Sequence, residues 1–433
     1  MSDLTLSNVK LLRDGRLEEG KITVSGARIA AIGSFTGGSG REIDCHGLAA
    51  LPALVDNHVH FREPGAEAKE DFASGSAASA HGGAATVFEI QNSPPLLTSP
   101  ELLAAKQALV QQKSCVQVGL YASATNEILP HMPALAEATA GLKLFMAPSH
   151  ADEGWESDES MRPFFSGCAR LGWMLIVHAE DGRLIREASA RVDASLPENF
   201  SRARPPVAEI SAVERAIELA REHGTRLHIF HLSTSGAVDL IAAARRSGVD
   251  VTASTCPHYL FFTDDDLAAR GSLLKVYPSI KAGHDRKRII EGLKEGVIEI
   301  ISTDHAPHTP AEKELPFESS PAGISSADLL LPLLTTLAAR GLFSLEEVVA
   351  LCARNPARIH GLVTGGSLDE GGVADIVLID LDARWTVSRD DFRSKASLSP
   401  YVGMELQGRV AATLAAGRSV YVDQTGVLRG AWA

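Results

Sequence analysis

The sequence predicts an α/β fold, a (β/α)₈ TIM barrel joined to a small β-sandwich domain built from the N- and C-terminal segments. Two observations lead to this prediction. In the middle of the chain, short apolar runs rich in β-branched residues alternate with longer stretches of helical period. At both ends, apolar and polar residues alternate with a period of two, as in strands with one buried face. The 433 residues are enough for a barrel of about 250 residues and a second domain.

The predicted barrel strands are short apolar runs, and helical stretches separate several of them. The runs are residues 53–61, 84–90, 115–123, 141–147, 174–180, 227–233, 250–255 and 297–303. The clearest helical stretches are 100–112, 207–224 and 237–248. A strand followed by a helix, repeated eight times, closes into a barrel of parallel strands.

The period-two segments mark the second domain. Residues 20–33 (GKITVSGARIAAIG) and 374–387 (ADIVLIDLDARWTV) are examples from the two ends. We expect residues 1–52 and 363–433 to meet in one small β-domain, and residues 53–362 to form the barrel.

Composition excludes several classes of partner. Lys and Arg number 41 against 54 Asp and Glu, a net charge of −13, so no global field attracts nucleic acid or an anionic membrane. The longest apolar stretch, Leu329 to Leu334, is too short to cross a bilayer. The five cysteines are scattered, odd in number and never in a CxxC pair, which favours reduced thiols over a disulfide framework or a cysteine zinc site. We expect a cytoplasmic protein that binds neither nucleic acid nor a membrane.

Polar side chains lie at or just beyond the carboxyl ends of the predicted strands, which converge on one face of a barrel. These residues are His58, His60, Arg62, Asn92, Lys143, His178, His231, Asp304 and His308. Each has an ordinary structural explanation alone: a core histidine, a cap at Asp304, or a snorkelling Lys143. Their gathering at one face favours a metal site instead.

The ligand types indicate a catalytic metal. Imidazoles with a carboxylate and an open position suit zinc in a catalytic role. A lysine beside divalent cations is repelled, and desolvation lowers its pKa towards the neutral amine. A neutral amine at Lys143 can take up CO₂ as a carbamate, whose two oxygens can bridge two metals.

Several motifs resemble those of the cyclic amidohydrolases. They are DNHVHFREPG (56–65), GLKLFMA (141–147), VHAE (177–180), HIFHLST (228–234), TCPHYL (255–260), STDHAPHT (302–309) and NPARIHGL (355–362). REPG and DHAPH make the chain most similar to the dihydroorotase group, and the resemblance covers nearly the whole chain.

The resemblance implies a site with two Zn²⁺ ions. His58, His60 and Asp304 would hold one ion and His178 and His231 the other, with a carboxylated Lys143 and a hydroxide bridging both. Asp304 would be the catalytic acid and base. Asp152 is an alternative to Lys143 as the bridging ligand. The implied reaction is the reversible hydrolysis of dihydroorotate to N-carbamoyl-aspartate in pyrimidine biosynthesis.

For the substrate's carboxylate, the resemblance implies Arg62, with hydrogen bonds from Asn92 and His308. A salt bridge from Arg62 to Glu63 or Glu67 is the structural alternative. The loop that contains Ser149 and His150 is a candidate lid.

The sequence departs from the dihydroorotase pattern at the predicted substrate walls. Residues 90–93 read IQNS, which keeps Asn92, and residues 323–327 read GISSA. Tyr277-Pro278-Ser279-Ile280-Lys281 stands where that group has Asn-Pro-Pro-Leu-Arg, so Tyr277 would face the substrate. A hydantoinase or allantoinase activity is therefore a second hypothesis. A catalytically silent scaffold that pairs with a transcarbamoylase is a third, and we expect a homo-oligomer, a dimer or a tetramer.

Overall fold

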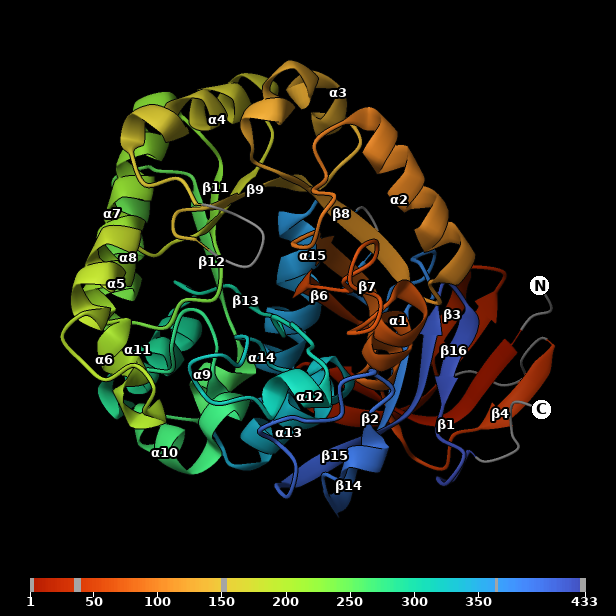
Figure 1. Ribbon diagram of the computed structural model, residues 1–433. Coiled ribbons are helices and arrows are strands. Elements are labelled where there is room, and N and C mark those ends of the chain that lie inside the picture. The colour runs from red at the N-terminus through yellow and green to blue at the C-terminus, as the bar shows by residue number, and fades with distance from the viewer. Residues whose placement is uncertain (1–3, 35–39, 149–153, 363–364, 429–433) are drawn as a thin grey trace.

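The computed structural model describes residues 4–34, 40–148, 154–362 and 365–428. It contains two eight-stranded sheets, a nearly closed parallel barrel and a separate, mostly antiparallel sheet. Figure 1 looks along the barrel, with helices around its outside and the second sheet against one flank. The predicted fold class is confirmed.

The barrel strands follow one another around the barrel in chain order. They are β6 (Leu54–Val59), β7 (Ala84–Ile90), β8 (Gln117–Ser123), β9 (Gly141–Phe145), β10 (Leu175–His178), β11 (Leu227–Ile229), β12 (Val251–Thr255) and β13 (Ile300–Ile301). Each lies within a predicted run, but only β7 spans its whole run, and β11 and β13 are the shortest strands. Beyond β13, Val59 bridges His305, and His60 donates its backbone N–H to the His305 carbonyl at 2.8 Å. The barrel thus closes at the point where its first histidines lie.

Helices surround the barrel, and the last of them packs against its inner cluster. They are α1 (Phe72–His81), α2 (Pro100–Lys113), α3 (Met132–Ala136), α4 (Asp158–Leu171), α5 (Gly182–Ser189), α6 (Phe200–Ala203), α7 (Pro206–His223), α8 (Ser235–Arg246), α9 (Pro257–Phe261), α10 (Leu267–Arg270), α11 (Gly283–Lys294), α12 (Pro310–Lys313), α13 (Leu330–Ala339), α14 (Leu345–Val349) and α15 (Asn355–Ile359). A π-helical turn, η6 (Ala350–Arg354), joins α14 to α15. The helical stretches predicted from the sequence are α2, α7 and α8.

Capping residues explain where the predicted helices begin and end. The Ser99 side chain accepts a hydrogen bond from the backbone N–H of Leu102, and Pro100 occupies the first turn of α2. Helix α7 also begins with a proline, Pro206, and ends at Gly224 in the left-handed conformation, φ 71°.

Apolar side chains fill the barrel from within and cover it from outside. Phe88, Tyr121, Ile176, Phe230 and Ile300 belong to one buried cluster contributed by five different barrel strands and their ends. A larger cluster joins the outer faces of the strands to the helices. The interior is therefore a packed core, and the space for a ligand lies at its carboxyl end.

The terminal segments form the second sheet. Its strands are β1 (Leu4–Arg13), β2 (Arg16–Ser25), β3 (Arg28–Gly33), β4 (Arg41–Asp44), β5 (Ala49–Pro52), β14 (Ile376–Thr386), β15 (Glu405–Ala415) and β16 (Arg418–Val422). Strand β5 pairs with β1 and β14, and only Ala53 separates it from β6. The boundaries between the two domains stay a prediction. Within the described residues, no helix combines the length and the apolar character that a membrane span requires.

A buried histidine below the carboxyl end of the barrel links stability to pH. His228 lies on β11, fully buried, and its Nδ1 is 2.7 Å from the Thr252 hydroxyl. Burial, with smaller contributions from nearby positive charges, holds the pKa of His228 well below its ordinary value. Below pH about 6.5, the unfolded chain gains a proton at this residue that the folded protein does not accept.

We predict that the buried imidazole of His228 lowers the free energy of unfolding as the pH falls below about 6.5. Above that pH, His228 should have no effect on the free energy of unfolding. The free energy of unfolding of His228→Gln, measured by urea titration, should fall less steeply than that of the wild type as the pH is lowered. The difference should reach about 1.4 kcal/mol for each unit by which folding lowers the pKa of His228. His284→Gln, at a histidine with a 74% exposed side chain, is the control and should keep the wild-type slope. Equal slopes in wild type and His228→Gln would contradict the prediction.

Candidate active site

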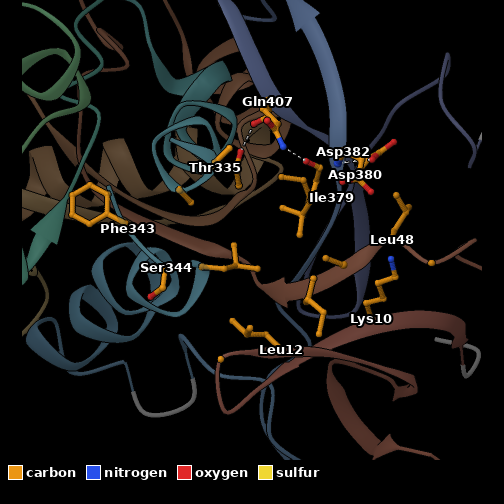
Figure 2. Close-up of a pocket in the computed structure, with 18 of the residues that line it drawn as sticks. Lys10, Leu12, Leu48, Thr335, Phe343, Ser344, Ile379, Asp380, Asp382 and Gln407 are labelled. Atoms are coloured by element: carbon orange, nitrogen blue, oxygen red, sulfur yellow. Dashed lines mark hydrogen bonds between the residues drawn. The ribbon is translucent and has the colours of Figure 1, made fainter. Parts of the chain in front are cut away.

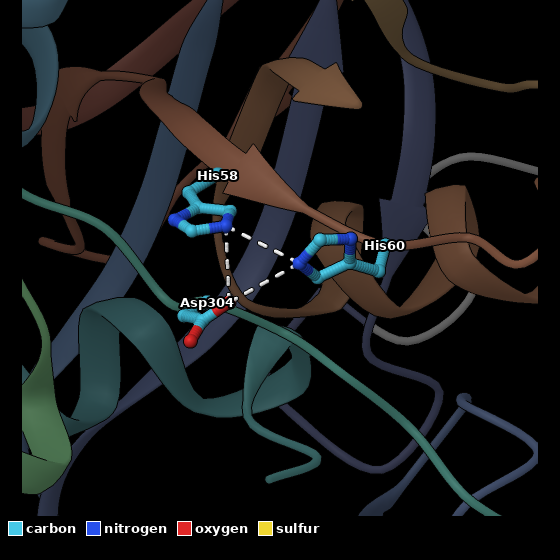
Figure 3. A group of neighbouring side chains, drawn as sticks. All are labelled: His58, His60 and Asp304. Carbon is cyan, nitrogen blue, oxygen red and sulfur yellow. Dashed lines mark hydrogen bonds and ion pairs between the residues drawn. The ribbon is translucent and has the colours of Figure 1, made fainter. Parts of the chain in front are cut away.

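Two histidines and an aspartate from opposite ends of the barrel sequence meet at its carboxyl end. His58 is on β6, His60 follows that strand, and Asp304 follows β13. The Oδ1 atom of Asp304 is 3.1 Å from His58 Nε2 and 3.3 Å from His60 Nε2 (Figure 3). The two Nε2 atoms are 3.2 Å apart. All three side chains are buried, so water does not separate them.

The hydrogen bonds of His60 identify which of its ring nitrogens can bind a metal. Its Nδ1 is 3.0 Å from the carbonyl oxygen of Ile90, which can only accept, so Nδ1 carries the proton and Nε2 has the lone pair. That lone pair faces the carboxylate of Asp304 at 3.3 Å. Two acceptors at this distance repel each other unless a cation lies between them. The three groups therefore fit a divalent metal ion.

A second pair of histidines lies beside the first. His178 is the last residue of β10, and its Nδ1 is 3.0 Å from the Nε2 of His231. The Nε2 of His178 donates to the carboxylate of Glu180 at 2.9 Å, which leaves Nδ1 as the acceptor. The ring of His231 lies 5.4 Å from the ring of His58, between centroids, so the two pairs form one cluster.

Lys143 lies on β9 and is buried in the same cluster. Its Nζ is 4.7 Å from the ring centroid of Phe145 and 4.4 Å from that of Phe230. The charge of Lys143 also contributes to the pKa values of all the histidines described above. The structure thus brings together the predicted metal ligands His58, His60, Lys143, His178, His231 and Asp304.

Burial controls the charge of these ligands. It is the largest cause that holds the pKa values of His58, His60 and His231 well below the ordinary value, and Lys143 lowers them further. Burial also raises the pKa of Asp304 to about 6. Neutral imidazoles next to a carboxylate are the protonation states in which these side chains bind metals.

The backbone is strained where three of the predicted site residues lie. Arg62, His231 and Asp304 have φ values of 62°, 42° and 47°, in the left-handed region that non-glycine residues rarely adopt. Such conformations persist only where surrounding contacts hold them, and they cluster at functional sites.

One residue that holds this geometry was missed in the sequence analysis. Asp56 is buried on β6, where its Oδ1 accepts from the backbone N–H groups of His58 at 3.3 Å and Thr303 at 3.0 Å. It thereby ties the strand that carries His58 to the loop that carries Asp304. Burial raises the pKa of Asp56 to about 6. Its position two residues before His58, on the same face of the strand, was the available signal.

A second missed group connects a histidine to the wall of the cavity. Glu180, which accepts from His178, forms a buried ion pair with the guanidinium of Arg204, whose Nε is 3.2 Å from Oε1. Burial alone would raise the pKa of Glu180, but Arg204 and His178 hold it well below its usual range. The same guanidinium lies over the ring of Tyr277, 3.8 Å from its centroid.

The altered loop of the sequence analysis docks on this arginine. The backbone carbonyl of Arg204 accepts from Lys281 Nζ at 2.6 Å and from the Ser279 hydroxyl at 3.2 Å. Tyr277 contacts the guanidinium of the same residue. Tyr277, Ser279 and Lys281, which depart from the dihydroorotase pattern, therefore all contact Arg204. The guanidinium of Arg204 in turn supports His178 through Glu180.

The predicted carboxylate-binding residues lie beside the cavity, and only one of them lines it. Arg62 Nη1 donates to Asn92 Oδ1 at 2.6 Å, and Nε donates to the Pro307 carbonyl at 3.2 Å. His308 Nε2 donates to the Ala322 carbonyl at 2.9 Å, so it cannot also accept from Arg62 Nη2, 3.3 Å away. The Nη2 group therefore keeps a donor to offer an anion.

Neither of the acidic neighbours considered as partners of Arg62 takes that role. Glu63 pairs with Lys113, and Glu67 accepts from the backbone N–H of Gly65. The guanidinium contacts Asn92 instead.

A cavity of about 30 Å³ lies over the cluster. Its lining residues come from the histidine cluster and from the loops around it: His58, His60, Asn92, Phe145, His178, His231, Val276, Tyr277, Asp304, Ala306, Ala322 and Gly323. Gly323 has φ 148°, and a Cβ there would lie 2.2 Å from the Ala306 carbonyl oxygen. The wall at residue 323 therefore requires glycine, although the residues after it differ from the dihydroorotase pattern.

A larger cavity of about 660 Å³ lies between the terminal sheet and the barrel helices (Figure 2). Lys10 and Ile379 from the sheet and Thr335 and Phe343 from the barrel line it. It shares no residue with the histidine cluster, and it lacks a group of converging ligands or nucleophiles among its described lining residues. The smaller cavity is therefore the candidate active site. Ser149, His150 and Asp152 lie outside the described residues.

We predict that Arg204→Lys weakens metal binding by about ten- to a hundredfold, because a lysine loses the forked contact that holds Glu180 against His178. Competition with a chelating dye measures the affinity. Tyr277→Phe keeps the ring under the guanidinium and is the matched control, which should bind metal as the wild type does. Unchanged metal affinity in Arg204→Lys would show that the ion pair does not orient His178.

Comparison with known proteins identifies the family. Residues 49–420 match the amidohydrolase family. An allantoinase of Rubrobacter xylanophilus is 35% identical, over 97% of this chain and 94% of the relative. A dihydroorotase of Pediococcus pentosaceus is 32% identical, over 96% and 98%. An L-hydantoinase structure from Arthrobacter aurescens superposes with a TM-score of 0.91 at 29% identity, over 97% of this chain and 96% of that chain. The chain therefore belongs to the amidohydrolase family and is a cyclic amide hydrolase.

Proposed function

We propose that the protein hydrolyses a cyclic amide with two zinc ions. His58, His60 and Asp304 would hold one ion and His178 and His231 the other, with a carboxylated Lys143 bridging them. The observation that carries the proposal is the approach of Asp304 Oδ1 to within 3.1 and 3.3 Å of two Nε2 atoms in a buried cluster. Such a donor set is the one that catalytic zinc prefers.

The ions, when bound, would polarise the amide carbonyl and lower the pKa of a water molecule. The side chains of the chain do the remaining work. Asp304 accepts the proton of the attacking water on its carboxylate and delivers it to the leaving ring nitrogen.

The first candidate substrate is dihydroorotate, a six-membered ring that carries a carboxylate. Supporting it is the buried guanidinium of Arg62, which binds Asn92 on the cavity wall and keeps a donor at Nη2. A planar cation in a site that excludes water selects for a carboxylate. The dihydroorotases among the relatives are named for the same reaction.

The second candidate is an uncharged ring of the hydantoin or allantoin type. Supporting it is Tyr277, which lines the cavity where the dihydroorotase pattern has an asparagine. A phenol there changes both the volume of the cavity and the hydrogen bonds that it offers a ring. The allantoinase relative and the hydantoinase structure make this candidate worth the same assay.

The assay that separates the candidates measures turnover of L-dihydroorotate, allantoin and a 5-substituted hydantoin by the purified protein loaded with zinc. Turnover of dihydroorotate alone supports the first candidate, and turnover of an uncharged ring alone supports the second. Hydrolysis of none of these rings by the zinc-loaded protein would contradict both candidates, and a zinc content below about one ion per chain would favour the silent scaffold.

We predict that Arg62→Gln lowers kcat/KM for a carboxylated ring by about a hundredfold, since a hydrogen bond to a charged group contributes about 1.5–3 kcal/mol. Turnover of an uncharged ring should change little and serves as the internal control. Steady-state kinetics on both rings measures the difference. An equal loss on both substrates would show that Arg62 supports the fold of the site and does not recognise charge.

We predict that Lys143→Ala loses about three orders of magnitude in kcat or more, because the bridging ligand is removed. Acetate or propionate should restore part of the activity by entering the space vacated by the lysine. Lys143→Met fills that space and is the matched control, which should stay inactive with either acid. Wild-type activity in Lys143→Ala would exclude the bridging role.

A further inference from the structure

A second group of potential ligands lies at the end of β12. Cys256 follows that strand, and His258 is in the first turn of α9. Ligand atoms of Cys256, His258 and Asp304 lie within 4.8 Å of one another, and all three residues are buried. Asp304 lines the candidate active-site cavity, whereas Cys256 and His258 are absent from its lining. The group therefore shares one carboxylate with the histidine cluster and lies outside the cavity.

The imidazole of His258 points to a ligand in this group. It is fully buried, and within the described part of the chain neither of its ring nitrogens has a hydrogen-bond partner. A buried polar group without a partner is destabilising, and a ligand at His258 would relieve that cost. The ring packs edge-on against Tyr259, with centroids 4.3 Å apart, so it is held in place without a polar contact.

The chemistry of the donor set selects the class of ligand. A thiolate and an imidazole bind borderline-soft cations such as Zn²⁺, Co²⁺ and Cd²⁺, and they are poor ligands for Mg²⁺ or Ca²⁺. A carboxylate has two oxygens and can contact cations on two sides. One cation would satisfy the sulfur, the imidazole and the carboxylate together, because a metal ion that binds Cys256 displaces the thiol proton and leaves a thiolate ligand.

We propose that Cys256, His258 and Asp304 form a separate site for a thiophilic divalent cation, distinct from the metal positions that face the cavity. A consequence rests on the proposed function: a cation there engages the carboxylate that moves the proton. Zinc in excess of the catalytic ions would then inhibit hydrolysis.

Cobalt titration of the full-length protein tests the site directly. A thiolate bound to Co²⁺ gives an intense near-ultraviolet charge-transfer band, whereas the ligands proposed at the histidine cluster contain no sulfur. We expect the wild type to develop this band as the last equivalent of Co²⁺ binds. Cys256→Ser should lose the band and bind one equivalent less, and His258→Asn should bind that equivalent about tenfold more weakly.

Cys45→Ser is the matched control, since Cys45 is also fully buried but belongs to the core of the terminal sheet. It should keep the band and the stoichiometry. A wild type without the band at saturating Co²⁺ would overturn the proposal even if the Cys256 variant fails to fold. A band that persists in Cys256→Ser would also overturn it.

Activity separates this proposal from the previous one. Excess zinc should inhibit the wild type and leave Cys256→Ser uninhibited. A protein that shows the thiolate band but hydrolyses no cyclic amide contradicts the proposed function alone. A protein that hydrolyses a cyclic amide without the band contradicts the separate cation site alone.

Discussion

The burial of the polar side chains at the carboxyl end of the barrel is the constraint on which the rest of the site depends. Burial disfavours charge, so it keeps the imidazoles of His58, His60 and His231 neutral and raises the pKa of Asp304 to about 6. In water the same imidazoles would be partly protonated, and protons would compete with a metal ion for the ring nitrogens. Packing of the barrel therefore prepares the ligands before any ion arrives.

The supporting carboxylates show how the protein meets the cost of that burial in two ways. Asp56 is surrounded by backbone N–H groups and a hydroxyl, and its pKa is raised to about 6. Glu180 has a guanidinium beside it, and its pKa is lowered. The first fixes the positions of two backbone segments, whereas the second keeps a full negative charge beside His178. Similar burial thus makes Asp56 a structural link between two backbone segments and Glu180 an electrostatic support for His178.

Much of the fold and the inner part of the site could be predicted from the sequence. Strand β7 begins and ends at the predicted residues because its run is apolar on both faces. The predicted metal ligands meet because the carboxyl ends of parallel strands converge. Short-range pattern does not reveal Arg204, which lies 24 positions from Glu180 and outside any predicted strand. The unsatisfied imidazole of His258 was equally invisible, since it depends on packing rather than on spacing.

The connection between the two sheets has a mechanical consequence. Strand β5 is held between β1 and β14, and after Ala53 the same extended chain becomes β6 and reaches His58. Five residues of extended chain span only about 16 Å, with no loop to absorb a displacement. A rotation of the terminal sheet would therefore pull directly on the strand that carries His58.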